Sequence, residues 1–301
     1  MKQDPPFFSI IIPTYNRPRQ LADCLGALAA LDYPRQGFEV IVVDDGSTVP
    51  LARVVAPFQP LFPLALVTRD NAGPAAARNT GAARARGRFL AFTDDDCLPA
   101  GNWLTALAAR FAEAPGQAVA GRTINALPQN PFATASQLII DMVHAYYNAN
   151  PREAQFSASN NLALPAETFR RLGGFDGSFR TSEDRDLIDR WRHGGHRLVY
   201  APEVLVYHAQ LLTWRGFCRQ HFNYGRGAFR FHRARARRGC GPFRPELPFY
   251  WHVLRSLPRV LDHRPQKAAL PLALLLAAWQ VANTTGYVWE NIKERTAPGM
   301  A

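Results

Sequence analysis

Lysine is scarce in this 301-residue chain, so nearly all of its positively charged side chains are guanidinium groups. Only Lys2, Lys267 and Lys293 are lysines among 35 basic residues, so arginine carries nearly all of the formal net charge of +11. Guanidinium groups match the geometry of phosphate, so a phosphorylated substrate, an anionic membrane or a nucleic acid is the expected kind of partner. A content of 47% hydrophobic and 20% charged residues excludes a disordered or fibrous chain.

Paired cysteines and long apolar runs are also lacking. The four cysteines are too scattered for a zinc knuckle or a disulfide framework, which suggests a reducing cytoplasm: Cys24, Cys97, Cys218 and Cys240. The apolar run from Phe7 to Ile12 ends at a proline and is too short for a signal-peptide core, so we expect no export. The run from Ala268 to Ala282 is interrupted by Pro271 and is shorter than the roughly 20 residues of a membrane span. It predicts an interfacial or packed helix.

Acidic residues are missing from the stretch between Val204 and Pro245. Its arginines alternate with aromatic residues: Arg215, Arg219, Arg226, Arg230, Arg233, Arg235, Arg237, Arg238 and Arg244. A basic, aromatic amphipathic helix suits an anionic membrane surface. Single-stranded nucleic acid is the rival partner, because bases stack on aromatic rings, and a solvated helix is the plain alternative. We favour the membrane because an apolar helix follows, and we expect no nucleic acid.

Short apolar, β-branched segments alternate with helical patterns over the first part of the chain. We expect strands at four places: Phe7 to Ile12, Phe38 to Val43, Leu64 to Thr68 and Arg88 to Thr93. Each strand ends at polar residues. The alternation predicts an α/β fold with a mainly parallel sheet flanked by helices. In such sheets, ligands bind beyond the carboxyl ends of the strands.

The later pattern is less regular. We expect helices at Asn102 to Glu113 and Ser136 to Tyr147, and strands at Ala118 to Thr123, Arg197 to Tyr200 and Val204 to Tyr207. Residues 1–210 are therefore predicted to form one domain. Its first part, about 7–123, is expected to bind the substrate that donates a group, and about 124–210 to serve the acceptor and catalysis. Residues 211–301 are expected to form a helical extension that is rich in arginine and apolar residues.

Three consecutive aspartates, Asp94 to Asp96, follow the fourth expected strand. Like charges crowd at such a place unless a positive group lies among them. Magnesium and manganese prefer carboxylate oxygens, and they bridge one or two carboxylates to substrate phosphates. The run therefore predicts a site for Mn²⁺ or Mg²⁺ with a diphosphate, and a solvated turn or helix cap is the plain alternative.

Five segments in this order resemble the family 2 glycosyltransferases of the GT-A fold: SIIIPTYN at Ser9 to Asn16, VVDDGST at Val42 to Thr48, FTDDDCL at Phe92 to Leu98, GGFD at Gly173 to Asp176, and Glu183-Asp184. The resemblance covers about residues 7–210. It implies inverting transfer of a sugar from a nucleoside-diphosphate sugar to a glycan or lipid-linked hydroxyl. It also implies a GT-A sheet that is mixed but mainly parallel.

The resemblance assigns roles in the donor site. It implies that Pro13 and Tyr15 border the base of the nucleotide, that Asp45 hydrogen-bonds this base, and that Asp44 orients the loop. Arg78 resembles the arginine that reaches the nucleotide. Asp94 and Asp95 are expected to contact the nucleotide sugar, and Asp94 to face the ribose or the metal.

The resemblance also assigns the metal ligands and the catalytic base. Asp96 is expected to bind the metal with Asp94, and His208 matches a histidine that completes the metal shell in many GT-A enzymes. Asp184 is the first choice for the base that deprotonates the acceptor, and Glu183 is the second. The plain alternatives are a packed histidine and an acidic first turn of a helix.

Some features depart from the family pattern. Cys97 stands where many members place a further acid, and Gln220 is not followed by the Arg-Trp pair of polymer-making members. The sequence also lacks the several membrane spans of polymer-making members, so we favour the transfer of single sugars. We expect a cytoplasmic protein that binds peripherally to the inner face of the cell membrane. A nucleotidyltransferase and a catalytically silent binding protein with the same fold remain the alternatives. The first loop has neither a glycine-rich phosphate loop with lysine nor a dinucleotide-binding Gly-x-Gly-x-x-Gly.

Overall fold

The computed structural model describes residues 7–241, 243, 246–262 and 266–296, which form two compact units. The first, here called the sheet unit, consists of Met1–Ala126, Asn150–Arg180 and Asp184–Gln210. The second, here called the helical unit, consists of Leu127–Ala149, Thr181–Glu183 and Leu211–Ala301. The extension expected after residue 210 therefore shares its unit with an earlier segment of the chain.

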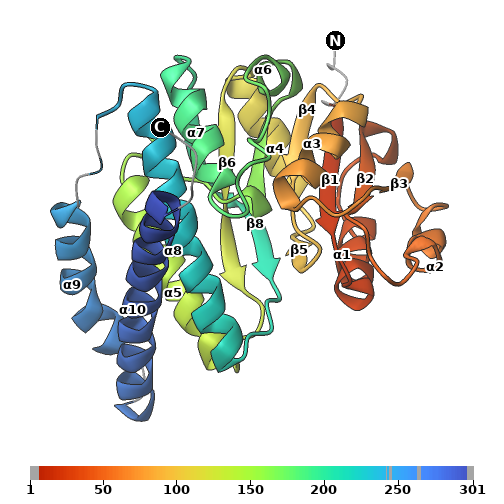
Figure 1. Ribbon diagram of the computed structural model, residues 1–301. Coiled ribbons are helices and arrows are strands. Elements are labelled where there is room, and N and C mark those ends of the chain that lie inside the picture. Colours follow the sequence, from red (N-terminus) through yellow and green to blue (C-terminus); the bar gives the residue numbers. More distant parts are fainter. Residues whose placement is uncertain (1–6, 242, 244–245, 263–265, 297–301) are drawn as a thin grey trace. The chain divides into compact units, whose positions relative to one another are not determined.

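A single mixed sheet organises the sheet unit (Figure 1). Its strands are β1 (Phe8–Thr14), β2 (Phe38–Asp44), β3 (Leu64–Thr68), β4 (Phe89–Phe92), β5 (Cys97–Pro99), β6 (Ala118–Asn125), β7 (Leu162–Pro165) and β8 (Leu198–His208). Their spatial order is β3-β2-β1-β4-β7-β6-β8-β5. The pairs β1–β2, β2–β3, β1–β4 and β6–β8 are parallel, whereas β4–β7, β6–β7 and β5–β8 are antiparallel. The expected mixed, mainly parallel sheet is confirmed.

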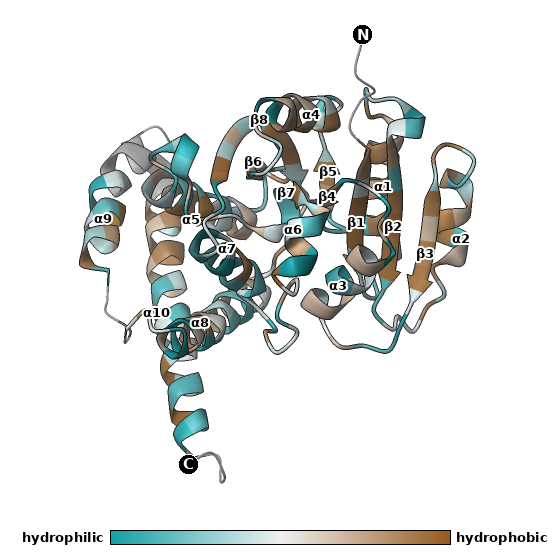
Figure 2. Cartoon of the chain, turned by 90° about the horizontal axis from the view of Figure 1, so that it is seen from above, coloured by the Kyte–Doolittle hydropathy of each residue, from teal (hydrophilic) through white to brown (hydrophobic). Residues whose placement is uncertain are grey.

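Both faces of the sheet are covered, because its central strands are apolar on both sides (Figure 2). Successive side chains of a strand point to opposite faces, so Ile10 and Ile12 enter one core and Ile11 enters the other. The first core is completed by α1 (Pro18–Ala29), α2 (Ala52–Val55) and α4 (Trp103–Glu113). The second is completed by α3 (Pro74–Arg84), α6 (Ala166–Arg171) and α7 (Glu183–His193).

The two closing strands expected near residues 197–207 form one continuous strand, β8. Its pairing with β6 is interrupted, because Gly121 lies opposite Ala201 and the next residue, Arg122, lies opposite Leu205. Asn161, in the short 3-10 helix η4 (Ser159–Asn161), donates hydrogen bonds of 2.9 Å to the carbonyls of Arg122 and Val204. These bonds satisfy backbone acceptors that the interruption leaves unpaired in the ladder.

The helical unit is built from α5 (Pro131–Tyr147), α8 (Trp214–Arg237), α9 (Leu247–Asp262) and α10 (Gln266–Thr296) (Figure 1). Side chains of α5, α8 and α10 form its core: Ala135, Ile139, Met142, Phe217, Leu272, Leu275 and Leu276. The α5 helix begins five residues before the expected start at Ser136, because the Asn130 side chain accepts a hydrogen bond from the Ala133 amide and caps it. No helix within the described ranges is both long enough and apolar enough to cross a bilayer.

The α8 and α10 helices touch through glycines. A Cβ atom added at Gly225 would lie 1.9 Å from the Asn283 carbonyl oxygen, and one added at Gly286 would lie 1.9 Å from that of Phe222. Arginines of α8 pair with α10 beside this contact, since Arg226 and Arg230 both bind Glu290. Small residues and buried ion pairs therefore fix how these two helices pack.

We expect Gly225→Ala to lower the free energy of unfolding of the helical unit by about 1–3 kcal/mol, because the added methyl group meets backbone that cannot move aside. Gly26→Ala on the exposed side of α1 is the matched control, because no atom lies within 4 Å of its added Cβ. It should stabilise the protein by about 0.5–1 kcal/mol. Thermal unfolding followed by circular dichroism measures both, and equal melting of Gly225→Ala and wild type would contradict the packing described.

Candidate active site

The carboxyl ends of β1, β2 and β4 lie side by side, and the polar loops that follow them form the candidate site. Thr14 lies opposite Asp44 in the parallel pair β1–β2, and Ile11 lies opposite Phe92 in the pair β1–β4. The Asp45 amide donates a 2.9 Å hydrogen bond to the Thr14 carbonyl, which joins the first two loops. The edge predicted to bind the ligand is therefore assembled by the strand register.

Asn16 locks the first two loops together. Its side-chain oxygen accepts a 2.8 Å hydrogen bond from the Thr48 amide, and its own amide donates one of 2.8 Å to the Ser47 hydroxyl. Its φ of 56° lies in the left-handed region, a strained conformation for a residue with a side chain that is concentrated at functional sites. Beside it, Pro13 is partly buried in β1, and Tyr15 leaves 47% of its surface exposed.

Asp44 and Asp45 organise the backbone on the second loop. Asp44 accepts a 2.9 Å hydrogen bond from the Ser47 amide. The buried Asp45 carboxylate accepts 2.7 Å and 3.2 Å hydrogen bonds from the amides of Gly73 and Ala72, directly before α3. Gly73 has a φ of 94°, which glycine adopts without strain. Asp45 therefore fixes the start of α3.

The α3 helix carries Arg78 to the aspartate run. Arg78 is buried, and its Nη2 donates a 2.6 Å hydrogen bond to Asp94 Oδ1. The guanidinium carbon lies 5.7 Å from the centre of the Phe175 ring, at a distance typical of a cation–π contact. Phe175 belongs to the GGFD segment of the sequence, so this segment contacts the Arg78 guanidinium group.

Asp95 and Asp96 are buried and share one arginine that the sequence analysis did not single out. Arg17 Nη1 lies 3.1 Å from Asp95 Oδ1 and 2.9 Å from Asp96 Oδ2. Thr14 also donates a 2.7 Å hydrogen bond to Asp95. The only signal for Arg17 in the sequence is its position directly after the first loop, at the start of α1. Burial raises the pKa of Asp95 to about 6, although the Arg17 charge opposes this shift.

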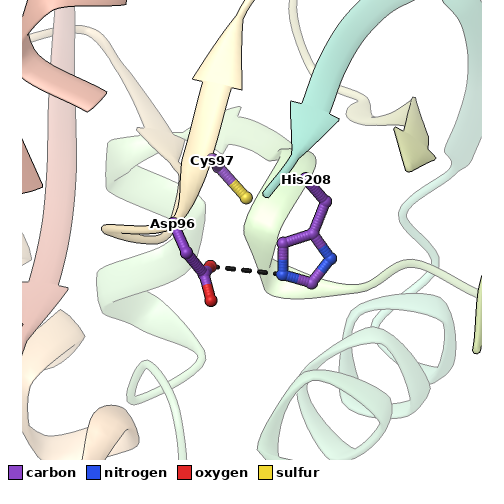
Figure 3. A group of neighbouring side chains, drawn as sticks. All are labelled: Asp96, Cys97 and His208. Carbon is purple, nitrogen blue, oxygen red and sulfur yellow. Dashed lines mark ion pairs between the residues drawn. The ribbon is translucent and has the colours of Figure 1, made fainter. Parts of the chain in front are cut away.

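His208 lies beside Asp96, as Figure 3 shows. Its Nε2 is 3.2 Å from Asp96 Oδ1, and the antiparallel pairing of β5 with β8 places it opposite Cys97. Burial acts to lower the pKa of His208, but the hydrogen bond and charge of Asp96 outweigh it, so this pKa is raised. Burial acts to raise the pKa of Asp96, but His208 and Arg17 outweigh it, so this pKa is lowered.

A divalent cation fits this cluster. A carboxylate oxygen of Asp96, the imidazole of His208 and the thiol of Cys97 bring their ligand atoms within 4.8 Å of one another. Carboxylate and imidazole are suitable ligands for Mn²⁺. Burial raises the pKa of the Cys97 thiol well above its ordinary range, and the charges of Asp94 and Asp96 add to this. The carboxylate of Asp96 and the imidazole of His208 are therefore better suited to a divalent cation than the protonated thiol is.

Asp184 reaches the same edge of the sheet through Ser159. It lies in the first turn of α7 and accepts hydrogen bonds from the amides of Arg185 (2.7 Å) and Ser159 (3.4 Å). Ser159 precedes β7, whose first residue Leu162 lies opposite Phe92, the last residue of β4. The register thus places Ser159 next to the loop that carries Asp94.

Glu183, the second choice for the base, is buried at the first position of α7 and groups with the helical unit. The residue before it, Ser182, has a φ of 70°. A left-handed serine is a second strained position beside a predicted catalytic motif. The acidic stretch therefore begins a helix, as expected, but its first two acids belong to different compact units.

The family of the chain is decided by a match of residues 9–175 to the model of Glycosyl transferase family 2. The chain belongs to this family. It is 32% identical over 218 residues to the pre-mycofactocin glycosyltransferase of Mycobacterium tuberculosis, which covers 68% of this chain and 44% of the relative. It is 27% identical over 205 residues to glycosyltransferase AglE of Haloferax volcanii, which covers 67% of each chain.

A third relative is validoxylamine A glucosyltransferase of Streptomyces hygroscopicus, 32% identical over 219 residues that cover 64% of this chain and 52% of the relative. The matched part therefore spans about half the length of two of these three relatives. Among solved structures, the mannosyltransferase PcManGT from Pyrobaculum calidifontis, in complex with GDP-Man and Mn²⁺, has a TM-score of 0.68 at 21% identity. That superposition covers 98% of this chain and 88% of PcManGT.

The solved chain of S. aureus TarS 1-349, in complex with UDP-GlcNAc, has a TM-score of 0.56 at 18% identity, over 96% of this chain and 92% of that chain. These likenesses confirm the GT-A fold expected for this family 2 member. The family match also decides between the enzyme classes that the sequence left open. The chain is a glycosyltransferase and not a nucleotidyltransferase.

The raised pKa of Asp95 predicts a pH dependence for the metal-free protein. Because the folded pKa of about 6 exceeds the ordinary 3.8, the fold favours the protonated acid, and this stabilisation is lost as pH rises through 6. The difference between the two pKa values corresponds to about 3 kcal/mol in the free energy of unfolding. About 2 kcal/mol of this stability is lost between about pH 4.5 and about pH 8. Asp95→Asn should therefore gain about 2 kcal/mol of stability relative to wild type over this interval.

Urea unfolding in EDTA at both pH values measures this change, with Asp23→Asn on the exposed side of α1 as the control. Any pH-independent loss of stability in Asp95→Asn cancels, because only the change between the two pH values is compared. A stability difference between Asp95→Asn and wild type that does not change with pH would contradict the assignment.

Proposed function

We propose that this glycosyltransferase moves a single sugar from a nucleoside-diphosphate sugar to an acceptor hydroxyl with the help of Mn²⁺ or Mg²⁺. The observation that carries this proposal is the pairing of Asp96 with His208 at 3.2 Å, beside two further aspartates at the end of β4. A carboxylate and an imidazole that lie together at the carboxyl ends of the strands of an α/β sheet can bind a divalent cation.

The donor nucleotide is proposed to bind across the ends of β1 and β2. Pro13 and Tyr15 border the base, and Asp45 accepts a hydrogen bond from it, while Asp44 holds the loop through Ser47. The large exposed fraction of Tyr15 supports this assignment, because an exposed ring beside a polar loop is available for stacking.

The phosphates and the sugar are proposed to lie over Arg78, Asp94 and Asp95. The Arg78 guanidinium is a donor suited to phosphate oxygens, and its contact with Asp94 holds it at the end of β4. Solved neighbours support a donor of this kind, since PcManGT was solved with GDP-Man and TarS with UDP-GlcNAc. The base and the sugar used by this chain stay open.

Asp96, with Asp94 and His208, would hold the cation. A bound divalent ion supplies Lewis-acid stabilisation for the negative charge that develops on the departing diphosphate. In the metal-free protein Arg17 lies against Asp96 and Asp95, so the site keeps a positive charge beside these carboxylates. The Mn²⁺ in the PcManGT complex supports the choice of a divalent metal.

Asp184 is proposed to take the proton of the acceptor hydroxyl. Its carboxylate accepts hydrogen bonds from the Ser159 and Arg185 amides at the start of α7, at the positive end of the helix dipole. One base and one direct displacement at the anomeric carbon would invert its configuration. The acceptor is proposed to be a glycan or a lipid-linked sugar, reached by a peripheral protein at a membrane surface.

The metal assignment predicts that Asp96→Asn weakens Mn²⁺-dependent binding of a nucleoside diphosphate at least tenfold, because one anionic ligand is lost. Isothermal titration with GDP and UDP, with and without Mn²⁺, measures this effect. Asp23→Asn, exposed on α1, should bind as wild type does. Absence of metal-dependent binding of either nucleotide to the wild-type protein would refute the proposed donor site.

The base assignment predicts that Asp184→Asn lowers the rate of sugar transfer by about 10²- to 10⁴-fold, the usual contribution of a general base. Donor binding should stay within about twofold of wild type, because Asp184 is proposed to act on the acceptor and not on the donor. Glu167→Gln on the exposed side of α6 is the control. A larger loss in Glu183→Gln would assign the base to Glu183, and intact binding with no turnover of any nucleotide sugar would indicate a silent binding protein.

A further inference from the structure

The helical unit exposes more large apolar side chains than the sheet unit does, and four of them lie within eight residues of α9. Leu247, Tyr250, Trp251 and Leu254 leave 72%, 41%, 57% and 58% of their surfaces exposed. Their spacing of three and four residues places them on one side of the helix. In the sheet unit, by contrast, the large apolar side chains exposed among the described residues are scattered singly.

The opposite side of α9 is packed within its own unit. The Phe249 ring lies 5.4 Å from that of Tyr146 and 5.8 Å from that of Tyr147, both on α5. Internal packing therefore holds the helix in place and explains the apolar residues of that side. It leaves the stripe of Leu247, Tyr250, Trp251 and Leu254 without a function inside the unit.

The C-terminal segment that carries the stripe is basic in sequence, although Glu246 directly precedes Leu247. Residues 211–301 contain 15 basic and 4 acidic residues, so they account for the whole formal charge of +11. Arg255 lies directly beside the stripe, with its guanidinium carbon 5.1 Å from the Trp251 ring centre. Tryptophan and tyrosine at the rim of an apolar stripe, next to arginine, are typical of helices that lie in the interface of an anionic membrane.

The α8 helix, which the sequence favoured as the membrane contact, is engaged within the helical unit. Its Phe217 and Phe231 are buried, Arg226 and Arg230 bind Glu290, and Arg233 binds Glu294. Arg244 lies outside the described residues. These ion pairs and buried rings use one side of α8 to build the unit, whereas the exposed apolar residues of α9 lie together on one side of that helix.

We infer that α9 docks on an anionic lipid surface, with Leu247, Tyr250, Trp251 and Leu254 entering the boundary between headgroups and acyl chains. The chemistry that recognises the lipid is an apolar stripe beside net positive charge, and each basic group near such a surface adds to the attraction. A second copy of the chain is disfavoured as the occupant, because it would bring the same positive charge to the contact. The inference deepens the proposed function, on which it rests for a membrane-bound acceptor.

Flotation of the full-length protein with vesicles tests the inference. Vesicles of equal parts phosphatidylcholine and phosphatidylglycerol should carry the wild-type protein, and phosphatidylcholine vesicles should carry at least tenfold less. The double variant Trp251→Glu with Leu254→Glu should float at least tenfold less than wild type on the anionic vesicles, because two apolar side chains are replaced by charges. Leu61→Glu, a matched exposed apolar position in the sheet unit, should float as wild type does.

Each alternative has its own outcome. Flotation of the double variant equal to wild type, in protein that melts at the wild-type temperature, would overturn the inference. A dimer that the double variant dissociates without a change in flotation would assign the stripe to a second copy, and it would also overturn the inference. Nucleotide titrations on the same samples separate the two proposals, because loss of flotation with intact Mn²⁺-dependent binding supports α9, whatever the acceptor is.

Discussion

The crowding of three carboxylates at the end of β4 is the constraint on which the site depends. Each one has a positive partner, since Asp94 meets Arg78, Asp95 and Asp96 share Arg17, and Asp96 also meets His208. These partners come from three separate parts of the chain, directly before α1, in α3 and at the end of β8. Neutralising the run therefore requires the complete sheet unit to fold, and the site exists only as a product of the fold.

Local sequence was sufficient for the elements that enclose this edge. The first four strands are apolar runs that stop at polar residues, so their positions and the edge where they meet could be predicted. The place of the aspartate run near the end of β4 could be predicted from the expected strand, whereas His208 was singled out only through the family resemblance. The strand β5 is only three residues long and carries no pattern of its own, so its place at the edge of the sheet could not be anticipated.

Long-range pairings account for what the sequence did not reveal. Arg17 is one of 32 arginines, and its contacts reach 78 and 79 residues along the chain, a distance that no local pattern encodes. The arginines of α8 suggested a free basic surface because Glu290, which receives two of them, lies 60 residues or more away. In the same way, the spacing of the apolar residues in α5 does not indicate whether this helix packs with α8 and α10 or with the sheet.

Asp45 connects the loop after β2 to the helix α3, which carries Arg78. Its carboxylate holds the amides that begin α3, and α3 in turn carries the guanidinium of Arg78 to the aspartate run. Replacement of Asp45 therefore disturbs the anchor of a whole helix as well as the proposed contact with the base. Under the proposed assignment, a loss of affinity in such a variant would report on the phosphate end as much as on the nucleobase.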